Sequence, residues 1–327
     1  MKVSVLIPVY NVEKYIEKCI ISIINQTMTN DVECIILNDY TPDKSIEIVN
    51  DILSSYNGNI SFRIINHEQN KGLAVARNSL ITAATGDYII HIDSDDYCEP
   101  DMIEKMYQKA IEKDADIVVA DYYKTEYKKE IYQHAIVSAD PDINIKLYFR
   151  GYAATYVWNK LVKRSLYTTH HLKNPEGLNN FEDAYMCICW FLFAQKVSYC
   201  PFAFVHHIVF NVNSYTNCKN FKSLKDQIGI CNEIEHVLKR NGKYKQFEQC
   251  FQIYLAGLQF NLLKNSHGNL QRKWNKDYKI AIRYILKHNG LNSWQKTALA
   301  FASCNMLWIF NLLRYLKRLQ NQILRNN

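Results

Sequence analysis

Residues 86–97 read GDYIIHIDSDDY, a short apolar run followed at once by a cluster of carboxylates. The run from Tyr88 to Ile92 is rich in β-branched and aromatic residues and follows a glycine, which predicts a buried strand. In open α/β sheets, ligands bind at the carboxyl ends of the strands. The sequence therefore predicts a functional site where this strand ends, and a helix opened by Pro100 after it.

The spacing of the carboxylates indicates a cation site. Asp93 and Asp95 are two residues apart, so both side chains point the same way if the backbone is extended. Two unit charges about 5 Å apart at an effective dielectric constant of about 20 repel by about 3 kcal/mol. Mg²⁺ or Mn²⁺ offsets such repulsion and keeps coordination positions for substrate phosphate oxygens. A solvated acidic turn is one alternative, and a calcium loop ending at Glu104 is another, although Cys98 stands where that loop needs glycine.

Composition is that of a globular protein with one catalytic domain and an accessory region: 327 residues, 48% apolar and 22% charged. Ten cysteines without a C-x-x-C pair argue against a zinc site and for reduced thiols in the cytoplasm. The apolar run at residues 3–9 is too short for a signal peptide. A net charge of +7, with no basic run interleaved with aromatics in the first 200 residues, predicts no nucleic-acid partner.

Strand and helix alternate four times in the first part of the chain. The predicted strands are residues 3–8, 32–37, 60–66 and 88–92, and the predicted helices start at Asn11, at Asp43 and at Gly72, with Asn11 and Asp43 as N-caps. This alternation predicts parallel βαβ units in a doubly wound sheet. A helix at 102–113 and a strand at 116–122 follow, then mixed structure to about residue 215. From residue 221 the pattern predicts helices at 221–240, 244–265, 276–288 and 294–324, separated by Asn-Gly or His-Gly pairs.

Two further polar residues are candidates for ligand binding. Asp39 follows the second strand, where its carboxylate can accept hydrogen bonds from a base N–H or a ribose hydroxyl; the alternative is a helix cap, a role that Asp43 already fills. Arg77 lies on the helix opened by Gly72 and can fork onto a carboxylate or a phosphate, or be an ordinary surface arginine. Neither a phosphate loop of the Walker type nor a G-x-G-x-x-G motif is present.

Six motifs, in this order, resemble those of glycosyltransferase family 2. They are residues 3–11 (VSVLIPVYN), Asn38-Asp39, residues 70–78 (NKGLAVARN), residues 93–96 (DSDD), residues 158–161 (WNKL) and Phe181-Glu182-Asp183. The resemblance implies an α/β, GT-A type, doubly wound and mostly parallel sheet in a catalytic domain at 1–218. Its nucleotide-binding half is residues 1–123 and its acceptor half 124–218, and a helical C-terminal region follows at 219–327.

The resemblance also implies a role for each motif. Residues expected to bind the nucleotide donor are Pro8, Val9, Tyr10, Asn11, Asp39, Lys71, Arg77, Asp93 and Ser94. Asp95, with Asp93, is expected to hold Mn²⁺ or Mg²⁺ on the diphosphate. Asp183 is the expected general base, with Glu182 next in line. The residues support this independently, since the acidic pair starts a helix, although it could simply complement the helix dipole.

The sequence departs from the family pattern at two places. Tyr40 replaces a glycine after Asp39, so a positive φ at residue 40 would be costly. Before Asn213-Ser214 the arginine or histidine often found in the family is absent, with Val209 and Asn211 in the corresponding places. Diphosphate contacts there are expected to be weaker or to come from His206 or His207; a structural role is the favoured alternative for either histidine, ahead of metal ligation.

The C-terminal helix predicts a membrane-surface element. Residues 297–313 carry no charge and are followed by Arg314, Lys317, Arg318 and Arg325, which lie opposite an apolar face on a helical wheel. The apolar face consists of Ile309, Leu312, Leu313, Leu316, Leu319 and Ile323. Packing on the preceding helices or in a homodimer is the alternative. A transmembrane span is disfavoured because the uncharged run has 17 residues.

These features predict an inverting, metal-dependent glycosyltransferase that moves a sugar from a nucleoside diphosphate donor, with UDP expected, to a hydroxyl of a glycan. A polyprenyl-linked acceptor at the inner face of the cell membrane, for a surface polysaccharide such as a capsule or lipopolysaccharide, is the expected setting. A sugar nucleotidyltransferase would need a glycine-rich triphosphate loop, which residues 8–11 do not provide. A catalytically inactive binding subunit is the other alternative, and the presence of Asp183 argues against it.

Overall fold

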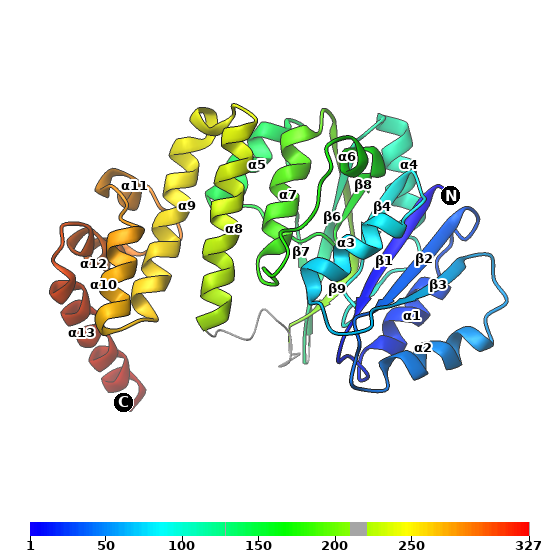
Figure 1. The fold of residues 1–327 in the computed structure, drawn as a ribbon, viewed down its shortest axis with the longest axis horizontal. Coiled ribbons are helices and arrows are strands. Elements are labelled where there is room, and N and C mark those ends of the chain that lie inside the picture. The colour runs from blue at the N-terminus through cyan, green and yellow to red at the C-terminus, as the bar shows by residue number, and fades with distance from the viewer. Residues whose placement is uncertain (128, 210–220, 327) are drawn as a thin grey trace. The chain divides into compact units, whose positions relative to one another are not determined.

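The structure is a computed structural model that describes residues 1–127, 129–209 and 221–326 (Figure 1). The chain forms two compact units. The first consists of Met1–Ile145 and Ala153–Ile234, and the second of Lys146–Tyr152 and Glu235–Asn327. The boundary between them therefore falls inside a helix that the sequence analysis assigned to the C-terminal region.

One nine-stranded sheet forms the centre of the first unit, in the order β3-β2-β1-β4-β8-β6-β9-β5, with β7 paired to β6. The strands are β1 (Val3–Val9), β2 (Val32–Asn38), β3 (Ser61–Asn66), β4 (Tyr88–His91), β5 (Tyr97–Cys98), β6 (Ile117–Glu126), β7 (Lys129–Gln133), β8 (Lys160–Lys163) and β9 (Val197–Ile208). The four strands β3, β2, β1 and β4 are parallel, as the βαβ alternation predicts. Strand β8 then enters antiparallel between β4 and β6.

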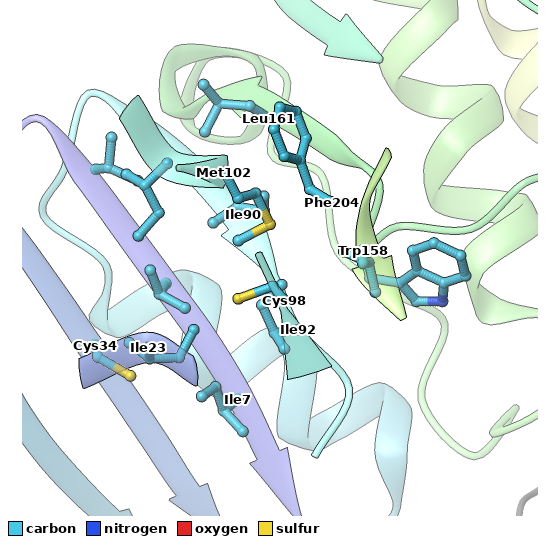
Figure 2. Close-up of a cluster of buried hydrophobic side chains, with 14 of the residues drawn as sticks. Ile7, Ile23, Cys34, Ile90, Ile92, Cys98, Met102, Trp158, Leu161 and Phe204 are labelled. Atoms are coloured by element: carbon cyan, nitrogen blue, oxygen red, sulfur yellow. The ribbon is translucent and has the colours of Figure 1, made fainter. Parts of the chain in front are cut away.

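Helices cover both faces of this sheet. They are α1 (Ile16–Ile24), α2 (Ser45–Ser54), α3 (Leu73–Ala83), α4 (Met102–Lys113), α5 (Pro141–Phe149), α6 (Arg164–Thr169), α7 (Glu182–Phe193) and α8 (Phe221–Arg240), of which α5 and α8 each extend into both units. Alternate residues of β1 and β2 join α1, α2 and α4 in one apolar cluster, part of which Figure 2 shows around Ile7, Cys34 and Met102. The other face of β1 and β2 packs against α3.

Two predicted helix starts in this unit are wrong. The first helix begins at Ile16 instead of Asn11, because Asn11 has a left-handed backbone (φ 56°) and its N–H donates to Thr41 Oγ1. Pro100 does not open α4, which begins at Met102. The carbonyl of Pro100 instead accepts a hydrogen bond from Thr27 N, which ties this segment to the end of α1 before the helix begins.

The second unit is helical. Besides the ends of α5 and α8 it contains α9 (Tyr244–Lys264), α10 (Gly268–Asp277), α11 (Ile282–Leu286), α12 (Ser293–Ser303) and α13 (Leu307–Asn326). The predicted helix at 276–288 is wrong, because His267-Gly268 starts α10 instead of merely ending α9. The predicted single helix at 294–324 is divided at Asn305, which takes φ 64°. Among the helices that the structure describes, none combines the length and apolar character needed to cross a bilayer.

Candidate active site

The site lies at the carboxyl edge of the parallel strands, where the register brings several predicted residues together. Val9 pairs with Asn38, which pairs with Asn66 in turn, and Ile92 N donates to Leu6 O. The loops that follow β1, β2, β3 and β4 therefore start at the same edge of the sheet. Residues 8–11, Asp39, the loop before α3 and the acidic turn at 93–96 all belong to those loops.

Hydrogen bonds between the loops after β1 and β2 fix both. Asn11 N donates to Thr41 Oγ1 at 2.8 Å, and Glu13 N donates to Asp43 Oδ2 at 2.9 Å. Asp43 also accepts from Ser45 N at the start of α2, but the N-cap position is occupied by Lys44, so the predicted N-cap is wrong by one residue. Tyr40 takes the positive φ (57°) that the family glycine would take, and its side chain is exposed. The loop keeps this conformation despite the steric cost of a Cβ.

The carboxylate of Asp39 is buried and binds the start of α3. Its Oδ1 accepts from Lys71 N at 2.9 Å and lies 2.6 Å from His67 Nδ1, while Oδ2 accepts from Gly72 N at 2.8 Å. His67 is oriented in turn by Ser79. These contacts fix the two residues that lead into α3, and Asp39 does not cap the turn after β2, which was its alternative role. Sequence analysis missed His67, because residue 67 is joined to Asp39 only through the sheet.

Gly72 is required at the start of α3 for two reasons. Its φ is 86°, and a β-carbon there would lie 2.4 Å from Asn179 Nδ2, whose Oδ1 accepts from Ala74 N. We expect Gly72→Ala to lower the free energy of unfolding by about 1 to 3 kcal/mol. Gly177→Ala, at φ 80° with open space around the new methyl, separates backbone strain from the clash. Urea unfolding should show the larger loss for Gly72→Ala; equal losses would mean that the Asn179 contact does not constrain the site.

Arg77 contacts three carboxylates from two distant parts of the sequence, Asp93 and the pair Glu182-Asp183. From α3 its Nη2 donates to Asp93 Oδ1 at 2.9 Å and lies 3.3 Å from Asp183 Oδ1, while Nε lies 3.5 Å from Glu182 Oε1. The Arg77 side chain is 3% exposed, Glu182 5%, Asp183 22% and Asp93 27%. Within the described residues, Arg77 Nε and Nη1 have no acceptor in hydrogen-bonding geometry. Arg77 therefore contacts carboxylates, as one of its two predicted roles requires.

Burial and charge act differently on the members of this cluster. Burial, followed by the charge of Asp183, raises the pKa of Glu182 well above its usual range. Burial also raises the pKa of Asp183, although Arg77 acts in the opposite direction. Burial lowers the pKa of Arg77, but the three carboxylates outweigh it and raise that pKa. Burial therefore favours the protonated form of both carboxyl groups, and the charge of Arg77 opposes this effect at both.

The acidic motif forms a turn, so the prediction of an extended backbone through Asp93 and Asp95 is wrong. Asp96 N donates to Asp93 O at 3.0 Å, which closes a β-turn. Asp96 is buried and accepts from Ile208 N at 2.8 Å and from His207 Nδ1 at 3.1 Å. Burial raises the pKa of Asp96 to about 7, while His207 opposes the shift. Asp93 and Asp95 are the partly exposed carboxylates of the turn, and Ser94 is buried between them.

The two histidines of β9 have different surroundings. His206 lies between Glu99 (Nε2, 2.8 Å) and Glu130 (Nδ1, 2.7 Å) and stacks on Tyr97. Both nitrogens of its ring therefore already have carboxylate partners. His207 stacks on Trp158 and pairs with Asp96, next to the acidic turn. Of the two, His207 is the one placed to assist that turn. The segment in which the sequence departs from the family pattern includes Val209, which the structure describes, and residues 211–214, which lie outside the described residues.

The remaining motif, residues 158–161, has a structural role. Buried Lys160 donates through Nζ to Tyr156 O at 2.6 Å and to Asn159 Oδ1 at 2.8 Å, and Asn159 Nδ2 donates to Ala120 O. These bonds fix the segment before β8, and Cys187 of α7 donates to Thr155 O in the same segment. The motif therefore holds α7, and with it Asp183, against the sheet.

His91 also borders the arginine cluster, and sequence analysis gave it no role. It is buried at the end of β4, stacks on Trp190 of α7, and lies 3.3 Å from Tyr167 Oη. Burial, followed by the charge of Arg77, lowers the pKa of His91 well below its usual range. A neutral histidine therefore packs beside Arg77. Its place in an apolar strand, one residue before Ile92, was the only signal available.

Comparisons with known proteins agree with this geometry. The family described as Glycosyl transferase family 2 matches residues 4–172. EpsH of Bacillus subtilis is 32% identical over 267 residues, which are 78% of this chain and 74% of EpsH. Glycosyltransferase GlyG of Streptococcus pneumoniae is 28% identical over 297 residues, which are 86% of this chain and 89% of GlyG.

Solved structures give the same result for the fold. Crystal structures of S. aureus TarS 1–349 with UDP and with UDP-GlcNAc superpose with TM-scores of 0.73 and 0.70 at 18% and 16% identity, and cover 98% of this chain and 92% of the TarS chain. The prediction of a GT-A type α/β fold with a helical C-terminal region is confirmed.

Proposed function

We propose that this chain, which belongs to glycosyl transferase family 2 and is a glycosyltransferase, inverts the anomeric centre as it moves a sugar from UDP to a hydroxyl of a glycan. The observation that carries the proposal is the cluster on Arg77, which places Asp183 of α7 and Asp93 of the acidic turn within contact of one guanidinium group. Asp183, the proposed base for the acceptor hydroxyl, and Asp93, a residue expected to bind the donor, therefore belong to one site. The TarS complexes with UDP and UDP-GlcNAc support UDP as the donor nucleotide.

In the proposed reaction Asp183 accepts the proton of the acceptor hydroxyl. The acceptor oxygen forms its bond to the anomeric carbon as the bond from that carbon to the diphosphate oxygen breaks on the opposite face, and the electron pair leaves with UDP. A partly exposed Asp183 at the start of α7 suits this role, since the base must reach a bound hydroxyl.

Mn²⁺ or Mg²⁺ fits the acidic turn, with Asp95 and Asp93 as the residues that would hold it. Asp93 and Asp95 are the partly exposed carboxylates of the turn, and Asp93 also accepts from Arg77 Nη2, whereas Asp96 is buried and binds Ile208 N and His207. In the described part of the chain, no three His, Cys, Asp or Glu side chains form a metal cluster. A small protein ligand set is typical of a divalent ion that also takes phosphate oxygens from its substrate. When bound, the ion would stabilise the charge that develops on the leaving diphosphate.

We expect Asp95→Ala to abolish the metal-dependent part of UDP affinity, because the variant lacks the carboxylate proposed to hold the cation on the diphosphate. Calorimetric titration of UDP with Mn²⁺ and with EDTA measures this. Asp51→Ala, which alters an exposed aspartate of α2, is the matched control and should bind as the unsubstituted protein does. An Asp95→Ala protein that keeps its affinity and its metal dependence would remove Asp95 from the site.

The acceptor proposed is a glycan linked to a polyprenyl lipid, for a surface polysaccharide. Support for a lipid-linked acceptor comes from the C-terminal segment, which carries an exposed apolar surface among basic residues. A radiolabelled sugar transferred from UDP into the butanol-extractable lipids of washed membranes tests it. Label that enters only water-soluble glycans would refute this part of the proposal and leave the donor assignment in place.

A further inference from the structure

The positive charge of the protein is concentrated at one end of the chain. Residues 278–327 contain eight lysines and arginines and no aspartate or glutamate. Subtracting these eight charges from the net charge of +7 leaves −1 for residues 1–277. None of the described basic side chains in this segment forms an ion pair. The C-terminal fifty residues therefore form a cationic segment without internal neutralisation.

One side of α13 packs inside the helical unit. Phe310 is fully buried against Phe260 of α9, and Asn311 exchanges hydrogen bonds with Gln271 of α10. Arg314 is also buried and donates through Nη1 to Leu263 O at 3.4 Å, near the end of α9. The sequence prediction that Arg314 belongs to an exposed basic face is therefore wrong, because Arg314 binds a carbonyl at the end of α9. Ile323 and Arg325 lie outside the residues whose side chains the structure describes.

The other side of α13 is an exposed apolar stripe. It consists of Trp308, Leu312, Tyr315, Leu316 and Leu319, and Trp308 is 68% exposed. The spacings of three and four residues place these side chains on one face of the helix. This stripe differs from the predicted face, because Ile309 and Leu313 turn partly inward. Arg318 is exposed and flanks the stripe, and Lys317 is half-buried.

We propose that this stripe and the cationic segment around it dock the protein on an anionic phospholipid surface, with α13 lying in the headgroup region. Apolar residues on one side of a helix with basic residues beside them are what an interfacial helix needs. Tryptophan and tyrosine suit the headgroup level because each ring has an apolar body and a polar edge. Phospholipid headgroups supply the negative charge that the segment itself lacks.

The positive charge of this segment favours a membrane over a second copy of the chain as the partner of the stripe. In a two-fold dimer through the stripe, the same surface of each copy would face the other. Both surfaces would be cationic, and the segment contains no carboxylate to pair with them. An anionic membrane meets the same surface with opposite charge. The inference does not depend on the identity of the donor or the acceptor.

Vesicle binding of the full chain tests the proposal directly. We expect co-sedimentation with vesicles of phosphatidylcholine and phosphatidylglycerol, little binding to phosphatidylcholine alone, and weaker binding as NaCl rises from about 0.05 to about 0.5 M. Trp308→Ser with Leu312→Ser should lower the partition coefficient at least about tenfold. Lys317→Gln with Arg318→Gln should lower it about tenfold on anionic vesicles only.

A matched control is Ile111→Ser, which replaces an exposed apolar side chain of α4 and should bind as the unsubstituted protein does. Thermal unfolding of each variant confirms that it is folded. Absence of binding at low salt, or equal losses for Ile111→Ser and the stripe variant, would overturn the proposal. So would a dimer in sedimentation velocity that the stripe variant dissociates while vesicles remain unbound. The vesicle assay contains no nucleotide sugar, so a negative result there does not bear on the proposed donor, which the UDP titration tests separately.

Discussion

Replacing Asp183 by asparagine is expected to lower kcat by about 10² to 10⁴, the usual contribution of a positioned general base. Asparagine keeps the shape of the side chain and its place at the start of α7, but it cannot accept the acceptor's proton. The affinity for UDP should not change, since no contact to the nucleotide is assigned to Asp183. Initial rates with labelled UDP-sugar and calorimetry with UDP measure the two quantities separately.

Glu182→Gln is the matched control for this experiment. Burial and Asp183 raise the pKa of Glu182 well above its usual range, so burial disfavours a charge at this position and a neutral amide of the same shape disturbs it little. Its kcat should therefore stay within about tenfold of the unsubstituted protein. If Asp183→Asn keeps more than about a tenth of the activity and Glu182→Gln does not, Glu182 is the base.

The dependence of kcat on pH gives a second readout for the same residue. A carboxylate base must be ionised, so the rate should fall as pH drops through the pKa of Asp183. Burial raises that pKa above the ordinary value of about 3.9, which moves the acidic limb toward neutral pH. The residual activity of Asp183→Asn should lack this limb. An unchanged limb in the variant would assign it to another group.

Local sequence patterns were sufficient to predict the first half of the fold. The apolar runs that became β1 to β4, and the helix after Gly72, are each specified within about ten residues. The antiparallel entry of β8 between β4 and β6 was not predictable, because that pairing joins Ile90 to Leu161 and depends on no local signal. The division between α12 and α13 had only a weak signal, an asparagine at position 305 that can adopt the left-handed conformation.

The sequence predicted single residues of the candidate site, but not the contacts between them. Sequence analysis selected Asp39, Arg77, Asp93 and Asp183 individually, each with an alternative. It could not show that Asp39 binds the loop before α3 or that Arg77 connects Asp93 to the proposed base, since residues 77, 93 and 183 meet only through tertiary packing. Residues buried at these contacts, such as His67 and His91, have no distinguishing sequence context and were missed.

The connecting role of Arg77 leads to the largest expected change in stability. Arg77→Met should lower the free energy of unfolding by about 3 to 5 kcal/mol at pH 8, because it leaves three acidic side chains close together without their cation. Glu182 is deeply buried, and Asp93 and Asp183 are partly buried. Without Arg77, the folded-state pKa values of Glu182 and Asp183 rise further. A carboxyl group whose pKa is higher in the folded than in the unfolded state costs stability at every pH above its unfolded pKa, and the cost grows until the folded pKa is passed.

The deficit of Arg77→Met relative to the unsubstituted protein should therefore be smaller at pH 5 than at pH 8, which urea unfolding at the two pH values measures. Arg63→Met is the matched control, since Arg63 is 48% exposed and its pairing with Glu33 at 3.3 Å should contribute no more than about 1 kcal/mol. Equal losses in the two variants, or a deficit of Arg77→Met that does not change with pH, would mean that Arg77 is not the cation that holds the three carboxylates together.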